Sequence, residues 1–342
     1  MARPPNLVPV VEAAYRLGES DEAWLSGVLD ELAPLIDGGW GVGAFFFDMA
    51  DENDFKFTVP MTVGARPEIA SALTAATSAM PAELVAPAFG AAACMLTASQ
   101  AVGCRDEFDH PLVQAFGHPF GMSDLLGFKV LDANKQGVMF ASGLAKVRFI
   151  SQRERHPWSL CAAHIQAGLR LRRALTPAGD AFAGAEAVIA PGGRLEHAEE
   201  PAQARGMRET LRGAALAIDE ARSARASPEE ALELWRGLVA GRWSLLEHFD
   251  HDGRRYFVAK KNDPELPDPR ALDLRERQVA AYAALGHPGK LIAYELGLSA
   301  SSVSRHLASA LRKLGASSRS ELARIVRAGE TTDLARPRRS NS

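Results

Sequence analysis

The sequence predicts two α+β domains with antiparallel sheets, followed by a C-terminal all-α domain of four helices in a helix-turn-helix arrangement. Apolar runs bounded by turn residues indicate strands, and they occur in two separate blocks before residue 262. Apolar residues three or four positions apart indicate helices beside these strands. Three prolines within six residues, Pro264, Pro267 and Pro269, then separate the two blocks from a purely helical end.

We expect five segments from these signals. Residues 1–178 and 180–262 form the two α+β domains, and residues 263–270 form an extended linker, because proline removes backbone donors and breaks helices. The helical domain is expected at residues 271–328, and the basic segment 329–342 is expected to be disordered. A length of 342 residues agrees with several domains, since single cores stop growing at about 250–300 residues.

Composition excludes several classes of protein. No stretch approaches the roughly 18 consecutive apolar residues of a membrane span, and the N-terminus lacks the apolar core of a secretion signal. The three cysteines are too few for a disulfide framework. We therefore expect a cytoplasmic protein without a membrane partner.

The small net charge of −3 hides an uneven distribution along the chain. From Asp268 onward there are 13 Lys and Arg residues against 7 Asp and Glu residues, whereas the residues before it carry 26 against 35. An acidic body with a basic C-terminal segment indicates a polyanionic partner for that segment.

The first block predicts a central antiparallel sheet between helices. Its expected elements are a helix at 22–36, strands at 41–49 and 55–63, alanine-rich helices to about 102, hairpin strands at 125–132 and 138–145, and a long helix at about 160–175. Gly137 is expected to take the positive φ of the hairpin turn. This order of elements is similar to that of GAF-type sensor domains.

The second block predicts a smaller domain of the same class. Its expected elements are hairpin strands at 186–190 and 194–197, a helix through 207–218, a second helix from Ser227, and strands at 242–249 and 254–261. Two strand pairs that enclose helices are similar to the arrangement of PAS-like domains.

The C-terminal domain carries clear signals for where its helices begin and end. Asp273 and Glu276 form a capping box, and Ser299 is placed to cap the third helix. Gly286 and Gly297 are placed to end the first two helices. The third helix has one apolar face, made of Val303, Leu307, Ala310, Leu311 and Leu314.

The opposite face of this third helix has the character of a DNA-reading surface. At 100° per residue, Ser301, Arg305, Ala308 and Arg312 lie opposite Val303. Small side chains let a helix approach base edges in the major groove, a long donor suits guanine, and a basic residue suits phosphate.

The residues from Leu272 to Val326 resemble the LuxR-type (GerE-like) helix-turn-helix. The resemblance rests on Leu272–Val279 and on Gly286, Lys290, Ile292, Ala293, Leu296, Ser299, Val303, His306 and Lys313-Leu314-Gly315. The sequence departs from the usual pattern at Pro288-Gly289, where Ser-Asn is common, at Leu291, where Glu is common, and at Ser302, where Thr is common.

The resemblance implies roles for individual side chains. Base edges or nearby backbone would be contacted by Ser302, Ser304, Arg305 and Ala308, with Ser301 on the same face. Phosphates would be contacted by Lys290 and Lys313, and the helical wheel adds Arg312 as a further phosphate contact. The fourth helix would help the domain to dimerise on double-stranded DNA. A sigma-factor tail or a protein-docking module is the alternative interpretation of such a basic helical unit.

Other residue clusters have simpler explanations than catalysis or cofactor binding. Cys161 and His164 have a spacing that could hold a metal, but His164 lies on an apolar helical stripe, which favours a satisfied pair in the core. No phosphate-binding loop, dinucleotide fingerprint or nucleophile motif occurs in the sequence. We therefore expect no enzyme activity, no cofactor and no metal.

The sequence thus predicts a homodimeric transcription regulator that binds an operator. Its acidic front domains would sense a small molecule or serve for dimerisation. In the alternative hypothesis, they would bind a regulatory protein instead of a small ligand.

Overall fold

The computed structural model describes most of the chain. The described residues are 5–17, 19–50, 55–78, 89, 93–101, 103, 113–174, 184–200, 202–221, 230–231, 243–249, 252–262, 272–314 and 316–334. The predicted linker, 263–270, lies outside these ranges, as do residues 335–342 of the predicted tail.

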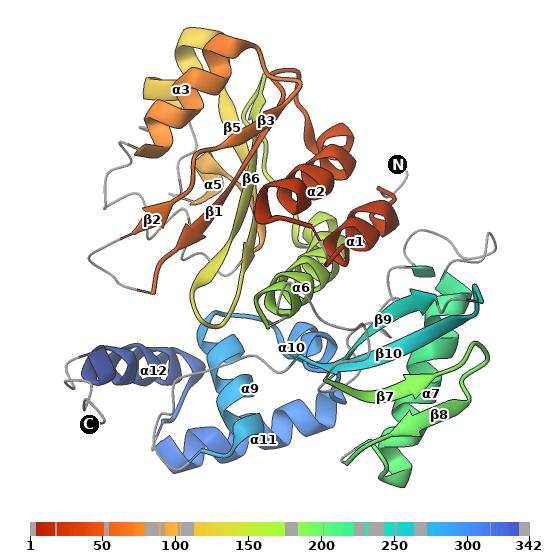
Figure 1. Ribbon diagram of the computed structural model, residues 1–342. Helices are drawn as coiled ribbons and strands as arrows, with labels where there is room; N and C mark the ends of the chain where they lie inside the picture. The colour runs from red at the N-terminus through yellow and green to blue at the C-terminus, as the bar shows by residue number, and fades with distance from the viewer. Residues whose placement is uncertain are drawn as a thin grey trace, which may run out of the picture.

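The first block folds around a six-stranded antiparallel sheet (Figure 1). Its strands are β1 (Val42–Asp48), β2 (Lys56–Phe57), β3 (Met61–Val63), β4 (Met95–Thr97), β5 (Asp124–Leu131) and β6 (Gln136–Leu144). They lie in the order β2-β1-β6-β5-β4, with β3 also paired to β1. The first and last strands of the block are therefore neighbours at the centre of the sheet.

Helices cover the two faces of this sheet differently. α1 (Val8–Ala14), α2 (Asp21–Ile36) and α6 (Gln152–Ala174) pack together on one face, while α3 (Pro67–Ser78) lies on the other (Figure 1). Trp24 of α2 stacks on Phe46 of β1, and Phe128 of β5 packs against Trp158 of α6. Alternate strand residues such as Phe45 face the other side, because successive side chains of a strand point to opposite faces.

Three local predictions for this block were wrong. Met95–Thr97 forms strand β4 and not a helix, because its pairing with β5 outweighs the helix propensity of the alanine-rich segment. The strand expected at 55–63 is split into β2 and β3 at a segment that contains Pro60, which has no N–H for a ladder bond. Lys135, not Gly137, takes the positive φ of the β5–β6 turn, at 64°.

Gly137 is required for a different reason. It lies opposite Leu131 at the start of the β5–β6 ladder, where an added Cβ would stand 1.9 Å from the carbonyl oxygen of Val130. This glycine therefore permits a close approach of two strands instead of an unusual backbone angle.

The second block forms a four-stranded antiparallel sheet in the order β8-β7-β10-β9. Its elements are β7 (Ala185–Ile189), β8 (Leu195–Ala198), α7 (Arg205–Ala221), β9 (Trp243–Phe249) and β10 (Arg255–Lys261). Gly192 and Gly193 take positive φ in the first hairpin turn. The α+β class is confirmed for both blocks, whereas the likeness to GAF and PAS domains stays a prediction. Buried side chains of the two sheets belong to one continuous core.

The C-terminal region consists of four helices around a core of their own. These are α9 (Leu274–Ala284), α10 (Gly289–Glu295), α11 (Ala300–Leu314) and α12 (Arg319–Leu334). α12 continues past residue 328, where we expected the domain to end and a disordered tail to begin. No proline occurs between Arg319 and Pro337 to stop the helix earlier.

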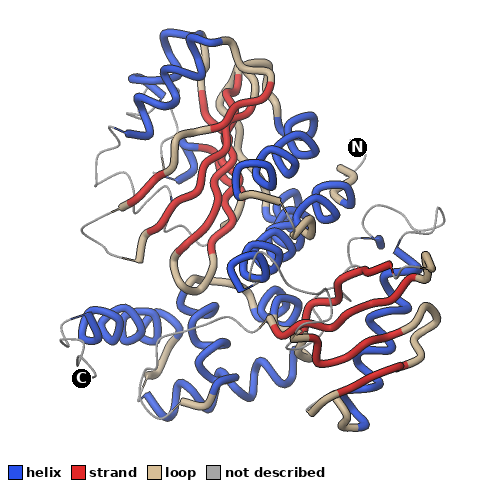
Figure 2. The backbone as a smooth tube through the Cα atoms, in the orientation of Figure 1, coloured by secondary structure: helices blue, strands red, loops and turns tan. Residues whose placement is uncertain are grey.

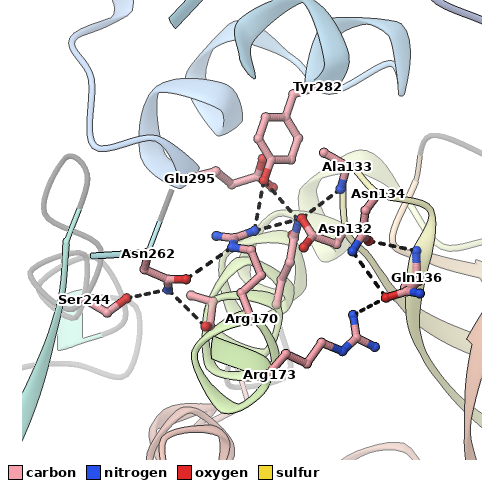
Figure 3. Close-up of polar contacts among 12 residues, drawn as sticks. Asp132, Ala133, Asn134, Gln136, Arg170, Arg173, Ser244, Asn262, Tyr282 and Glu295 are labelled. Carbon is pink, nitrogen blue, oxygen red and sulfur yellow. Dashed lines mark hydrogen bonds and ion pairs between the residues drawn. The ribbon is translucent and has the colours of Figure 1, made fainter. Parts of the chain in front are cut away.

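The helical domain docks against α6 and the β5–β6 hairpin through a buried polar network (Figure 3). Asp132, at the end of β5, accepts hydrogen bonds from Arg170 Nη1 and Gln166 Nε2 of α6, both at 2.8 Å. The same two donors reach the hydroxyl of Tyr282 in α9, at 3.2 and 3.1 Å. Asp132, Gln166 and Tyr282 are buried, so the network holds α9 in a fixed position on the first domain.

Asn262 extends this network to the second sheet. Its side-chain oxygen accepts from Arg170 Nε at 3.4 Å, and its amide donates to Ser244 of β9 at 2.7 Å and to the carbonyl of Ala167 at 3.0 Å. One arginine side chain is therefore in contact with all three parts of the chain. Figure 2 shows the C-terminal helices below the first sheet, with the last of them, α12, on the side away from the second sheet.

A second contact joins α10 to α6. The Nε2 atom of His164 lies 2.6 Å from the hydroxyl of Tyr294, and its Nδ1 atom lies 3.2 Å from the hydroxyl of Tyr15, which directly follows α1. Leu291, where the LuxR-type pattern commonly has Glu, packs against the core that the two sheets share. This departure from the pattern thus has a structural reason, because a glutamate would place a charge in that apolar contact.

The burial of His164 predicts a pH dependence of stability. Burial lowers the pKa of His164 to about 3, whereas an unfolded chain has a histidine pKa of about 6.5. The unfolded state therefore binds the proton more readily, so the stabilisation is full above about pH 6.5 and is lost progressively as the pH falls towards 3. At pH 5 the loss should be about 2 kcal/mol.

Urea unfolding at pH 7.5 and pH 5 measures this loss. We expect His164→Gln to show a smaller pH dependence than the wild type, and His156→Gln, exposed on the same helix, to behave like the wild type. Equal pH dependence in His164→Gln and the wild type would contradict the assignment.

Candidate nucleic-acid interface

The first helix of the C-terminal domain starts with the predicted capping box. Asp273 Oδ1 accepts from the backbone N–H of Glu276 at 2.8 Å, and Glu276 Oε2 accepts from the N–H of Asp273 at 2.9 Å. α9 then packs against α11 and α12. The cap therefore fixes the start of the helix on which the rest of the domain is built.

A glycine turn connects α10 to α11 and gives the helix-turn-helix geometry. Gly286 ends the first helix with φ of 83°, and Gly297 follows α10 with φ of 60°. Ser299 then caps α11, because its hydroxyl accepts from the N–H of Ser302 at 3.1 Å. Each of these positions agrees with the prediction from sequence.

Helix α11 turns one face inward and one outward. Val303, Leu307 and Ala310 are buried in the core of the domain. Burial of the two larger side chains, Val303 and Leu307, stabilises the fold by roughly 1.5–3 kcal/mol each. The opposite face is thereby presented to solvent along the whole helix.

The outward face holds the residues that sequence analysis selected for DNA contact. Ser301, Ser304, Arg305, Ala308 and Arg312 are exposed, and Ser302 is half-buried. The hydroxyl of Ser304 donates to the carbonyl of Ala300 at 3.0 Å, and Arg312 Nη2 donates to Ser309 at 3.2 Å. The face is therefore small and polar at its start and basic at its end.

Arg305 stands out on this face because it is available for an external ligand. Within the described part of the chain, it is exposed and makes no hydrogen bond or ion pair. Lys290 in α10 is likewise exposed and makes no hydrogen bond or ion pair with the described residues. A planar guanidinium with five donors, held on a helix in this way, suits the paired acceptors of guanine in the major groove.

Lys313 lies in a different environment. Its Nζ atom is 2.6 Å from Glu276 Oε2, and the Glu276 side chain is only 4 % exposed. Hydrogen bonds from Lys313 and Ser309 hold the pKa of Glu276 at about 2. Lys313 thus ties α11 to the capping box of α9, a role that sequence analysis missed because the two residues are 37 positions apart.

The part of the chain that carries the α11 face and the glycine turn matches a known protein family. Residues 271–326 match the family GerE, bacterial regulatory proteins of the luxR family. This match confirms the LuxR-type resemblance of the C-terminal motif and indicates a DNA-binding transcription regulator. It covers α9, α10, α11 and the first part of α12, and it includes neither of the two sheets.

No curated protein was found to match this sequence. In the described part of the chain, no helix is both long enough and apolar enough to cross a membrane.

The pair Cys161 and His164 is also explained by the structure. His164 lies between two tyrosine hydroxyls. This agrees with the prediction that it is a core residue with satisfied hydrogen bonds. Among the described residues, no group of three His, Cys, Asp or Glu side chains is placed to hold a metal.

The tie between Lys313 and Glu276 predicts a selective loss of stability. In Lys313→Met, the buried carboxylate loses its charged partner, and we expect the free energy of unfolding to fall by about 1–2 kcal/mol. Lys290→Met removes an equally long exposed cation and should change the free energy by less than about 0.5 kcal/mol. Urea titration of both variants at pH 7 makes the comparison, and equal stability of the two would contradict the structural role of Lys313.

Proposed function

We propose that this protein is a sequence-specific transcription regulator that inserts helix α11 into the major groove of its operator. The observation that supports this most directly is the exposed α11 face, on which Arg305 points to solvent within a domain of the luxR family. Arg305 reads a base, with Ser302, Ser304 and Ala308 close to base edges or the adjacent backbone.

Phosphate contacts position the helix in the groove. Lys290 lies at the start of α10, which precedes α11 in the motif, and Arg312 lies near the end of α11. These two cations would flank the base-reading segment. Ser301 lies at the exposed start of the same face and contributes a small hydroxyl close to the backbone of the DNA.

We further propose that the protein acts as a homodimer on a two-fold symmetric operator. Ile325 and Val326 of α12 are only half-buried, although Leu322 on the same helix is fully buried. An α12–α12 contact would cover these two side chains and set the distance between two α11 helices. Half-site spacing would then follow from the geometry of the dimer.

The front domains have a regulatory role in this proposal. Their buried contact with α9 and α10 fixes the orientation of the helical domain, yet it leaves the α11 face exposed. Regulation therefore would act on the placement of the domain in a dimer and not by uncovering the recognition helix. Control by a partner protein instead of a small ligand is the alternative form of the same proposal.

A selection from random-sequence DNA duplexes tests the role of Arg305. We expect the wild type to enrich a two-fold symmetric motif and Arg305→Ala to lose discrimination at one base position in each half-site. One well-placed bidentate contact is worth roughly 1–3 kcal/mol, which is about a 5- to 150-fold preference. Arg208→Ala, which removes an exposed arginine on α7, is the matched control and should enrich the wild-type motif.

Titrations at several salt concentrations separate base readout from phosphate contact. Lys290→Met should weaken binding to all sequences similarly and reduce the salt slope by about one per domain. The proposal fails if Arg305→Ala enriches the same motif with unchanged discrimination, or if the wild type retains all duplexes equally.

A further inference from the structure

Helix α7 has one face that packs on the second sheet and one face that is exposed. Its inward residues include Leu211, Ala215 and Ile218, which are buried. Figure 1 shows the helix at the edge of the molecule, beside the second sheet. At 100° per residue, five exposed side chains at spacings of four, three, four and four positions lie together on the outer side. These residues, which we call the α7 face, are Arg205, Glu209, Arg212, Leu216 and Glu220.

The α7 face has an apolar side chain next to an open position. Leu216 is 41 % exposed, which is unusual for a leucine on a helix that covers a sheet. Gly213 precedes it by three residues, and an added Cβ at Gly213 would have no atom within 4 Å. Two helices pack closely when a side chain of one enters a depression on the other. The outer side of α7 provides both parts of such a contact.

The charges of α7 oppose the dipole of the helix. Arg205 and Arg208 lie in its first turn, which contains no acidic residue, and Asp219 and Glu220 lie in its last turn, which contains no basic residue. A helix has a partial positive charge at its N-terminus and a partial negative charge at its C-terminus, so the reverse arrangement would be favourable. The charge pattern of α7 is therefore unfavourable within the helix itself.

Contacts within the chain compensate only part of this pattern. Asp219 pairs with Arg255 of β10. Arg205 lies 3.4 Å from Glu209, but both side chains are exposed, and such a surface pair contributes little. Arg212 and Glu220 make no hydrogen bond or ion pair with any residue that the structure describes. The α7 face thus presents a basic end and an acidic end to solvent.

We propose that the α7 face binds the same face of a second copy of this chain, with the two helices antiparallel. The two-fold axis passes beside the midpoint between Arg212 and Gly213, so residues equally far from this midpoint lie opposite each other. Arg205 then lies opposite the partner's Glu220, and Leu216 lies opposite the partner's Glu209. The contact extends over about 22 Å of helix, because each residue adds about 1.5 Å.

This arrangement pairs the charges that are unfavourable in a single copy. The basic first turn of one α7 lies beside the acidic last turn of the other, which also carries the negative end of the helix dipole. Arg212 lies one turn from the partner's Glu209. Leu216 packs over the partner's Gly213, where no side chain is in the way. A parallel pair would place arginines against arginines, so the charges select the antiparallel orientation.

The α7 contact is separate from the proposed contact between two α12 helices. It joins the front domains, whereas α12 belongs to the DNA-binding domain. We therefore expect dimers in the absence of DNA. Self-association through α7 does not rest on the proposed function, and only its consequence for operator spacing does.

Sedimentation of the full-length protein without DNA, over the micromolar range, tests this contact by exchange of charges. Arg205→Glu and Glu220→Arg should each weaken dimerisation about tenfold or more, because each replaces two opposite-charge pairs with like-charge contacts. The variant with both substitutions should dimerise like the wild type. Each single substitution agrees better with the helix dipole than the wild-type residue does, so thermal unfolding of the monomer should not be impaired.

A second set of variants tests the position of the contact. Leu216→Glu should give a monomer, because it places two charges at the centre of the interface. Met207→Glu is the matched control: Met207 is 38 % exposed on the same helix but lies on the opposite side from Leu216, and this variant should dimerise like the wild type. Ile325→Glu, on α12, should leave the dimer intact without DNA.

Three results would overturn the proposal. They are a monomeric wild type throughout the micromolar range, a dimer that withstands Leu216→Glu, and a double charge exchange that associates no better than the single variants. Loss of the dimer in Ile325→Glu together with an unchanged Leu216→Glu would assign self-association to α12 instead. Because no DNA is present, these results are independent of whether α11 reads an operator.

Discussion

The buried carboxylate of Asp132 is the group on which the arrangement of the whole chain depends. It lies at the end of a central strand, and it receives the side chains of Gln166 and Arg170, which also hold Tyr282 of the helical domain. Removal of one partner from a buried ion pair typically costs about 3–5 kcal/mol, because the other charge is left without compensation. This network therefore requires one particular geometry. Its polar groups are all hydrogen-bonded only when α6, the β5–β6 hairpin and α9 are packed against one another.

The two faces of the first sheet are packed differently. The face towards α2 and α6 is filled with aromatic side chains such as Phe46 and Phe128, and it provides a rigid support for the helical domain. On the other face, the small residues Gly43, Ala141 and Gly127 lie next to one another, and the side chain of Leu73 fills the space over Gly43. A single strand, β5, contributes Gly127 to this second face and leads into the carboxylate of Asp132, so this face and the contact with the helical domain share one structural element.

The helical domain combines this support with an accessible surface. Its inner face joins α11 to α9 through Val303 and through the Lys313–Glu276 pair, while α9 and α10 carry the contacts to the first domain. The outward face of α11 takes no part in either set of contacts. The α11 face is therefore held rigidly from behind and stays exposed, which is the condition that major-groove recognition by a helix requires.

The sequence by itself determined the features that depend on neighbours close along the chain. The Asp273 capping box, the positive φ at Gly297 and the two faces of α11 follow from spacings of one to four residues, and all were predicted correctly. Strand β4, the pairing of Lys313 with Glu276 and the network around Asp132 depended on residues far apart in sequence. A local pattern specifies which face of an element is apolar, but not which distant element covers it. That choice is made by long-range packing in the tertiary structure.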